Sequence, residues 1–205
     1  MEVQTWTVPR EWEGDTCVCI GGGESLTDEQ VNYAMIRHHW RTIGVNNAYQ
    51  KAPWLDVLYA ADHQWWSWHW EKVKGLPCRK VTVDKRAKQD WPDLLYLGPT
   101  DSESHGLDGF DPDPSRLRTG KNGGYQAIHL AAHFGANRII LLGYDQKGGH
   151  WHEPHPGGQS DIFDMCARYW PTLAEAMKER NIDVINCSPG SALTVFPMAN
   201  LEDVL

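Results

Sequence analysis

A short apolar run that leads into three glycines is the feature that most restricts how this chain can fold. The run covers residues 16–20, the glycines occupy positions 21–23, and Thr27 forms a capping-box pattern with Gln30. Glycines at the end of a strand let the backbone turn sharply and let a ligand approach the N–H groups of the turn. The pattern therefore predicts a strand over 16–20, a helix over about 28–40, and a binding site at the turn that joins them.

Apolar runs and helix-like segments alternate along the rest of the chain. Further strands are expected at 41–46, 56–62, 79–83, 138–143 and 183–186, and further helices at 63–73, 122–134 and 160–180. Strands separated by helices are typical of an α/β protein with a mostly parallel sheet. We therefore expect a single Rossmann-like domain over 1–205, with helices on both faces of the sheet. Prolines and a weak pattern predict an irregular insert at about 84–119.

The composition fits a globular protein with no membrane span. The 205 residues suffice for one domain with a core, and 41% of them are apolar. No apolar run approaches the about 20 residues that cross a bilayer, and no signal segment begins the chain, so a cytoplasmic location is expected. The net charge of −8 argues against broad affinity for nucleic acid, although a local basic patch is compatible with it.

The cysteines show no metal or disulfide pattern. There are five of them, none in a CxxC pair, and the odd number argues against a disulfide framework. Cys17 and Cys19 lie two apart on the first expected strand, so their side chains share one face. We expect buried structural thiols.

The glycine turn departs from the dinucleotide-binding fingerprint. Gly21 and Gly23 fit the pattern G-x-G-x-x-G, but Leu26 stands at the third glycine. The second expected strand ends in Asn46 and Asn47, not in the acidic residue that binds the NAD ribose. A standard NAD or FAD site is therefore not expected.

Small and polar residues follow the ends of the expected strands, at the edge where open α/β sheets bind ligands. Amides there can contact a base or ribose without adding charge, and the backbone of a glycine turn can hold an anion. The alternatives are plain turns and helix caps without a ligand. The residues expected to contact a nucleotide are Gly21, Gly22, Gly23, Ser25, Asn46, Asn47, Asp62, Asn122, Gly123, Gly124, Asp145 and Ser188.

A histidine-rich loop follows the clearest expected strand. His150, His152 and His155 lie close together with Glu153. One interpretation is a divalent metal held by these four side chains. A second is general acid–base catalysis by one of the histidines, whose ordinary pKa lies near neutrality. A third is a solvated polar loop. Pro154 excludes the helical HExxH metal site.

Two further histidines, His129 and His133, lie four residues apart on the helix expected at 122–134 and share one of its faces. We expect a polar helix face, with a metal site as the alternative.

Several segments together resemble one group of enzymes. They are the glycine turn at 21–26, Asn46-Asn47, and the segments 122–125, 139–145 and 186–193. These segments are similar to the motifs of bacterial CMP-sialic acid sialyltransferases and of the related 6-hydroxymethylpterin diphosphokinase-like and flagellin-glycosylation accessory proteins. The whole chain also looks like a set of phage and prophage proteins labelled "norphogenetic".

The resemblance implies a cytidine-nucleotide site that needs no metal for catalysis, with a histidine base at His150, His152 or His155. Glu24 stands where those enzymes have proline, and Asn122-Gly123 stands where they have Thr-Ser. The extra histidines have no counterpart there. The donor therefore stays open, and a metal-dependent variant stays an alternative.

The predicted function is nucleotide-sugar-dependent glycosyl transfer. A loop histidine would act as acid or base, and tryptophans at 65–70 would stack on a base or sugar ring. The alternatives are metal-dependent phosphoryl or pyrophosphoryl transfer or hydrolysis on a nucleotide, and a phage accessory protein that binds a nucleotide without turnover. The expected partner is a nucleotide-type small molecule with an unspecified acceptor. If the chain is phage-encoded, the expected location is the host cytoplasm.

Overall fold

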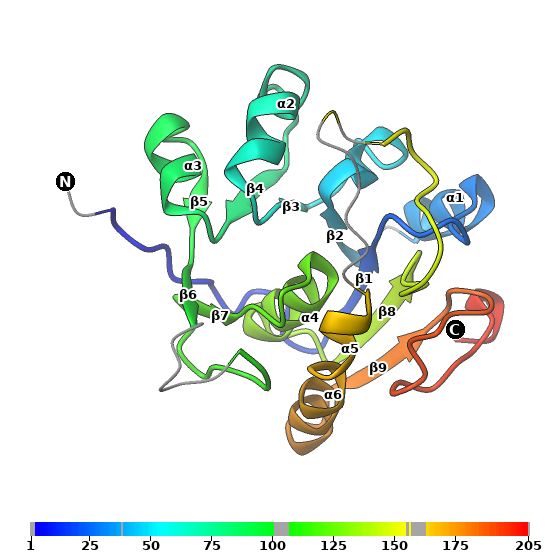
Figure 1. Ribbon diagram of the computed structural model, residues 1–205. Coiled ribbons are helices and arrows are strands. Elements are labelled where there is room, and N and C mark those ends of the chain that lie inside the picture. The colour runs from blue at the N-terminus through cyan, green and yellow to red at the C-terminus, as the bar shows by residue number, and fades with distance from the viewer. Residues whose placement is uncertain (1–2, 38, 101–106, 155, 157–162, 205) are drawn as a thin grey trace.

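A seven-stranded sheet forms the centre of the protein. The computed structural model describes residues 3–37, 39–100, 107–154, 156 and 163–204. All pairs in the sheet are parallel, and the strand order is β5-β4-β3-β2-β1-β8-β9 (Figure 1). The strands are β1 (Thr16–Ile20), β2 (Arg41–Val45), β3 (Val57–Tyr59), β4 (Arg79–Thr82), β5 (Leu95–Tyr96), β8 (Arg138–Leu142) and β9 (Asp183–Asn186). The expected Rossmann-like α/β fold is confirmed.

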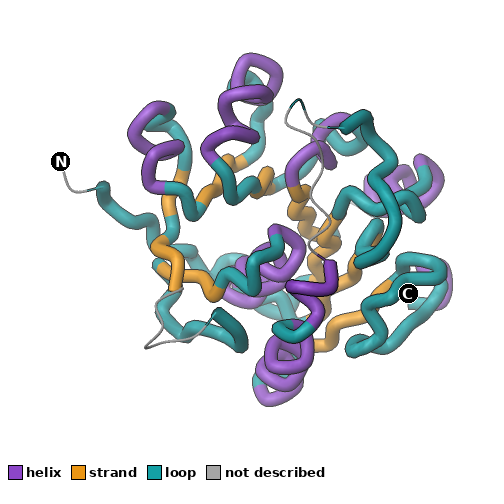
Figure 2. The backbone as a smooth tube through the Cα atoms, viewed as in Figure 1, coloured by secondary structure: helices purple, strands orange, loops and turns teal. Residues whose placement is uncertain are grey.

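Helices cover both faces of this sheet (Figure 2). Val18 and Ile20 pack with α1 (Asp28–Ile36), the 3₁₀ helix η1 (Asn46–Gln50), α2 (His63–Val73) and α3 (Lys85–Asp90). Cys17 and Cys19 face the other way and pack with α4 (Gly123–Phe134) and α6 (Trp170–Glu179). This alternation follows from the two-residue period of a strand. The remaining helices are α5 (Phe163–Ala167) and the 3₁₀ helix η2 (Leu201–Asp203).

All five cysteines are buried and unpaired, as expected. Burial raises the pKa of the Cys17 thiol, which keeps it protonated at neutral pH. The thiols act as small apolar core groups. No helix in the described part of the chain is both long and apolar enough to cross a membrane.

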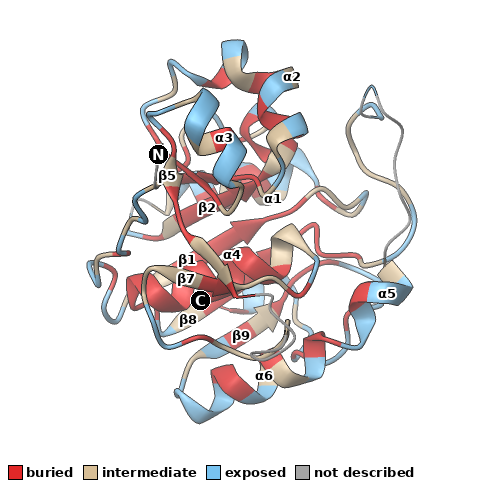
Figure 3. Ribbon diagram, turned by 60° about the vertical axis from the view of Figure 1, so that its left-hand side comes forward, coloured by how far each residue is buried: buried red, intermediate tan, exposed pale blue. Residues whose placement is uncertain are grey.

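The direction of strand addition reverses between β1 and β8. The chain adds β2, β3, β4 and β5 on one side of β1, then returns through α4 and adds β8 and β9 on the other side. Such a reversal leaves a crevice outside the carboxyl ends of the two strands, where open α/β sheets bind their ligands. Helix α4 is buried along most of its length beside this point (Figure 3).

The segment at 84–119 is more regular than expected. Its described part contains α3, β5, β6 (Gly98–Thr100) and β7 (Arg116–Arg118), and the last two pair in a separate parallel sheet. Leu97 and Leu117 are fully buried there. The sequence pattern there is weak because strands of two or three residues are too short to show a periodic pattern.

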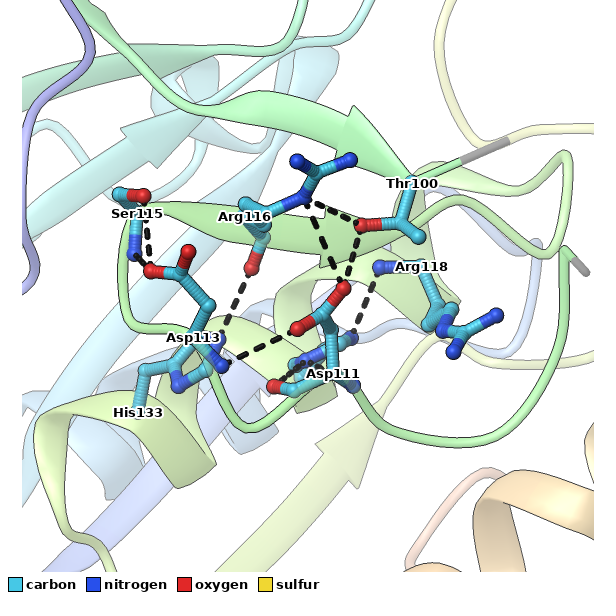
Figure 4. A network of polar contacts seen from close by, with 8 residues as sticks. Thr100, Asp111, Asp113, Ser115, Arg116, Arg118 and His133 are labelled. Carbon is cyan, nitrogen blue, oxygen red and sulfur yellow. Dashed lines mark hydrogen bonds and ion pairs between the residues drawn. The ribbon is translucent and has the colours of Figure 1, made fainter. Parts of the chain in front are cut away.

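A polar network holds the connection into β7 in place (Figure 4). The carboxylate of Asp111 accepts hydrogen bonds from the Thr100 hydroxyl at 2.5 Å and from the Asp113 N–H at 3.0 Å. Arg116 Nε lies 3.7 Å from the same carboxylate and donates to Thr100 Oγ1. Burial alone would raise the pKa of Asp111, but these hydrogen bonds, with Arg118 and Arg116, hold it below its usual value.

Candidate functional site

A pocket of about 1020 Å³ opens at the carboxyl edge of the sheet. Its walls come from the turns after β1, β2, β3, β4 and β8 and from the first turn of α4. The volume is at the upper end of the range for small-molecule sites. The pocket therefore occupies the crevice that the reversal between β1 and β8 creates.

The glycines after β1 are required by the loop that follows β8. A Cβ on Gly21 would lie 2.6 Å from the Gly143 oxygen, and a Cβ on Gly23 would lie 2.5 Å from Asp145 Cγ. Atoms cannot approach so closely without displacement of one of them. At Gly22 the nearest atom would be His152 Nε2, at 3.4 Å, which is an ordinary contact. Gly21 and Gly23 thus leave room for the loop after β8, and Gly22 faces the pocket.

Most N–H groups of this turn are used within the protein. The Gly23 N–H donates to the Gly143 oxygen at 2.8 Å, and the Ser25 N–H donates to Asp145 Oδ2 at 2.8 Å. The Ser25 hydroxyl donates to the other oxygen of Asp145. The Gly22 N–H has no hydrogen-bond partner among the described residues. The turn therefore presents the Gly22 N–H, and not Ser25, to an anion.

The start of α4 forms the opposite wall. Asn122 Oδ1 accepts the N–H groups of Gly124 at 2.8 Å and of Tyr125 at 3.2 Å. Gly123 is the first helical residue, so its N–H has no partner inside the helix. The aligned peptide dipoles make this end of α4 positive. An anion in the pocket therefore meets backbone donors from two elements.

Tyr144 connects the two glycine walls. It is 2% exposed, and Cβ atoms on Gly21 and Gly124 would lie 3.2 and 2.7 Å from its ring. Its hydroxyl donates to the Gly124 oxygen at 3.2 Å. The segment Gly143-Tyr144-Asp145 therefore contacts both the turn after β1 and the start of α4, and holds these two walls in place. The role of Tyr144 was not predicted, although its place beside Asp145, directly after the clearest expected strand, was a usable signal.

Some of the polar residues at the other strand ends line the pocket, and others are buried in the core. Asn46 lines the pocket with a left-handed backbone (φ 52°), and Asp62 lines it at the start of α2. Asn47 is buried, and its Oδ1 accepts the indole N–H of Trp65 at 2.8 Å. Ser188 is buried, and its hydroxyl accepts the Tyr144 N–H at 2.7 Å. Asn47, Ser188 and Ser25 thus lie outside the pocket lining and support its walls.

The tryptophans of α2 likewise have different roles. Trp65 and Trp68 line the pocket. Trp66 is fully buried and donates to the Ala60 oxygen at 3.1 Å, while Trp70 packs on Trp91 with ring centroids 5.8 Å apart. Trp65 is buried and stacks on His69, so stacking on a ligand is a proposal for Trp68.

The histidine loop packs against the glycine turn. His150 forms an antiparallel bridge with Gly23. The Trp151 backbone N–H donates to the Gly22 oxygen at 3.2 Å, and its indole N–H donates to the Gly21 oxygen at 3.4 Å. The rings of His150 and His152 line the pocket with centroids 5.0 Å apart. The loop thus brings two of the predicted catalytic histidines to the pocket.

Glu153, a further member of the predicted metal set, is not in this wall. Glu153 is exposed and does not line the pocket, and His155 lies outside the described residues. Among the residues that the structure describes, no group of three or more histidine, cysteine, aspartate or glutamate side chains is arranged to hold a metal ion.

Charge is unevenly distributed along the pocket. Lys121, Lys147 and the Asp145 carboxylate, which accepts hydrogen bonds from Ser25, line the end formed by β1, β8 and α4. Asp62, Asp84 and Arg86 line the end at β3 and β4, where Asp84 accepts the His63 N–H at 3.0 Å. The balance of these formal charges is therefore positive at the glycine turns and negative at the other end. A lysine directly before Asn122 and another two residues after Asp145 were the sequence signals for the positive end.

His129 and His133 are buried, so the expectation of a solvent-facing polar helix face was wrong. His129 Nδ1 accepts the Arg118 N–H at 3.2 Å, and His133 Nε2 donates to the Arg116 oxygen at 2.9 Å. Both rings pack on Phe110. The histidines share a face of α4, as their spacing of four residues in a helix requires. Strand β7 and the segment before it cover that face.

This packing predicts acid sensitivity. Burial lowers the pKa of His129 and His133 below the usual 6.5 in the folded state. The unfolded chain then binds more protons, so the contribution to stability is complete above about pH 6.5 and is lost as the pH falls. The pKa values of nearby Asp111 and Asp113 are lowered by hydrogen bonds, so these carboxylates stay charged over this range. We expect the free energy of unfolding to fall by about 1–2.5 kcal/mol between pH 7.5 and 5.5.

Urea denaturation at the two pH values measures this loss. The double variant His129→Gln/His133→Gln should show a much flatter dependence over the same range. An equally steep dependence in the variant would assign the effect to other groups.

Comparisons with known proteins identify the fold. No protein-family model and no curated protein sequence matches the chain. The structure of the MAf glycosyltransferase from Magnetospirillum magneticum AMB-1 is similar with a TM-score of 0.62 and 16% identity, over 98% of this chain and 36% of that one. The chain thus spans little more than a third of that enzyme.

The sialyltransferase CstII from Campylobacter jejuni is also similar. Its complex with cytidine-5'-monophosphate gives a TM-score of 0.56 and 11% identity, over 91% of this chain and 85% of that one. Its complex with the substrate analogue CMP-3FNeuAc gives 0.51 and 10%, over 90% and 85%. The chain therefore has the glycosyltransferase-type fold of these enzymes.

Proposed function

We propose that this protein transfers a sugar from a nucleotide-sugar donor, with the donor phosphate bound between the turn after β1 and the start of α4. The observation that carries the proposal is the pair of N–H groups at Gly22 and Gly123, which line one pocket near Lys121 and Lys147. Backbone donors at a helix start, together with lysines, are a recurrent phosphate site. The shared fold with glycosyltransferases supports this use of the pocket.

The nucleoside would extend from the phosphate toward β2 and β3. Asn46 and Asp62 line that part of the pocket and offer hydrogen-bond partners to ribose hydroxyls or a base. Trp68 lines the same part and offers an aromatic face for stacking. Strands in a sheet are about 4.8 Å apart, so Asp62 lies roughly 10 Å along the edge from the turn after β1.

The chemistry would take place beside the histidine loop. The bond between the anomeric carbon and the phosphate oxygen breaks, and a bond from that carbon to an acceptor hydroxyl oxygen forms. His150 or His152 would accept the proton of that hydroxyl, because a neutral imidazole is a suitable base near neutral pH. The phosphate leaves with its negative charge, which the N–H groups and lysines stabilise.

A thermal-shift screen of nucleoside monophosphates and nucleotide sugars tests the proposal. At a hundredfold excess over Kd a ligand adds about 2.7 kcal/mol, which raises the Tm by roughly 5–10 °C. We expect such a rise with one nucleotide, equally in a chelator and with divalent ions. A rise in Tm that requires a divalent ion would favour the alternative hypothesis of metal-dependent phosphoryl transfer. No rise with any nucleotide would contradict the proposed function.

A further inference from the structure

A second pocket, of about 500 Å³, lies at the amino end of the sheet, away from the site described above. The end of α4 and the segments that lead into β8 and β9 form one side of it, and the segment before β7 forms the other. Its floor is apolar or buried and includes Val8, Phe110, Ala132 and Ala136. Its volume falls within the usual range for small-molecule sites.

Among the residues that the structure describes, the lining of this second pocket carries positive charge and no carboxylate. Arg10 and Arg180 line it, although the whole chain has a net charge of −8. Arg180 lies 4.2 Å from the Phe110 ring and donates to the Ala176 oxygen at 2.9 Å, so its guanidinium is held over the apolar floor. The acidic partners, Glu13 and Glu179, are exposed and do not line the pocket. An anion is therefore the ligand that this charge pattern favours.

Polar groups in the lining can hydrogen-bond a ligand. His133 is 6% exposed, and its Nε2 donates to the Arg116 oxygen, beside the network of Figure 4. Its Nδ1 has no hydrogen bond among the described residues and is an acceptor in the neutral ring. The side-chain amides of Asn137 and Asn181 lie at the rim, also without a hydrogen bond in the described part of the chain. They supply donors for an anionic head group.

We propose that this second pocket binds a small carboxylate with a flat apolar body. The planar guanidinium of Arg180 matches a carboxylate, which accepts two parallel hydrogen bonds from it. The apolar body would pack on Phe110, Pro112 and Pro114. This site shares no lining residue with the first pocket, and the proposal does not depend on sugar transfer.

Titration with benzoate, benzamide and inorganic phosphate tests this site. Benzamide has the shape of benzoate without its charge, and phosphate has charge without an apolar body. We expect benzoate to perturb the side-chain amide resonances of Asn137 and Asn181 and the His133 ring resonances. A charged hydrogen bond contributes enough for benzamide to bind about tenfold or more weakly.

Two variants separate binding from folding. Arg180→Gln should weaken benzoate about tenfold or more, and Asn181→Asp, which adds a negative charge at the rim, should also weaken it. The control Arg86→Gln removes a guanidinium that is 75% exposed at the first pocket and should leave benzoate binding unchanged. Equal binding of benzamide, phosphate binding as tight as benzoate, or full benzoate affinity in Asn181→Asp would overturn the proposal.

Discussion

Replacement of Gly23 by alanine is expected to destabilise the protein by about 3 kcal/mol or more, at the upper end of the cost of overpacking. The new Cβ would lie 2.5 Å from Asp145 Cγ and 2.8 Å from the Gly143 oxygen. Asp145 cannot move aside cheaply, because both of its oxygens accept hydrogen bonds from Ser25. The substitution therefore separates the turn after β1 from the loop after β8. Urea denaturation measures the loss.

Gly22→Ala is the matched control for this change. Its Cβ would have no neighbour closer than 3.4 Å, so the free energy of unfolding should change by about 1 kcal/mol or less. The methyl group would instead stand beside the N–H proposed to hold the phosphate, and nucleotide affinity should fall about tenfold or more. The account of this turn would be wrong if alanine at 23 were tolerated as well as alanine at 22.

Loss of both pocket histidines is expected to abolish most of the transfer activity. His150→Ala/His152→Ala should lower the rate of transfer by about 100-fold or more, the usual contribution of a general acid or base. Nucleotide affinity should change much less, because the phosphate is proposed to bind the N–H groups and lysines on the other walls. Single-turnover rates, together with nucleotide Kd values, separate the two effects.

His39→Ala serves as the control, because His39 is exposed and does not line the pocket. It should leave both the rate and the Kd unchanged. If the double variant transferred sugar at the normal rate to every productive acceptor, neither histidine would be the acid or base.

Long elements with a clear pattern could be predicted from the sequence, and short non-local ones could not. The bounds of β1 and α2 match the expected ranges because each is one continuous apolar or amphipathic segment between turn residues. Strands β6 and β7 each have three residues and pair only with each other across a long connection. Such pairing depends on tertiary contacts that no local pattern records.

The sequence predicted which strand ends and turns form the candidate site, but not which side chains face the pocket. Parallel strands bring their carboxyl ends to one edge, which is why Gly22, Asn46 and Asp62 could be grouped in advance. Whether a polar residue at that edge faces a ligand or another residue depends on its neighbours. The Asn47 side chain accepts a hydrogen bond from the Trp65 indole, and the Ser25 N–H donates to Asp145. Neither group is therefore directed to a ligand.

The most direct test is a nucleotide titration followed through the backbone amide resonances of the protein. If the phosphate binds between the two turns, the amides of Gly22 and Gly123 should show the largest shifts, and Gly22→Ala should weaken the titration without unfolding the chain. Nucleotide binding that leaves both amides unshifted, or that perturbs only residues away from the carboxyl edge of the sheet, would contradict the account.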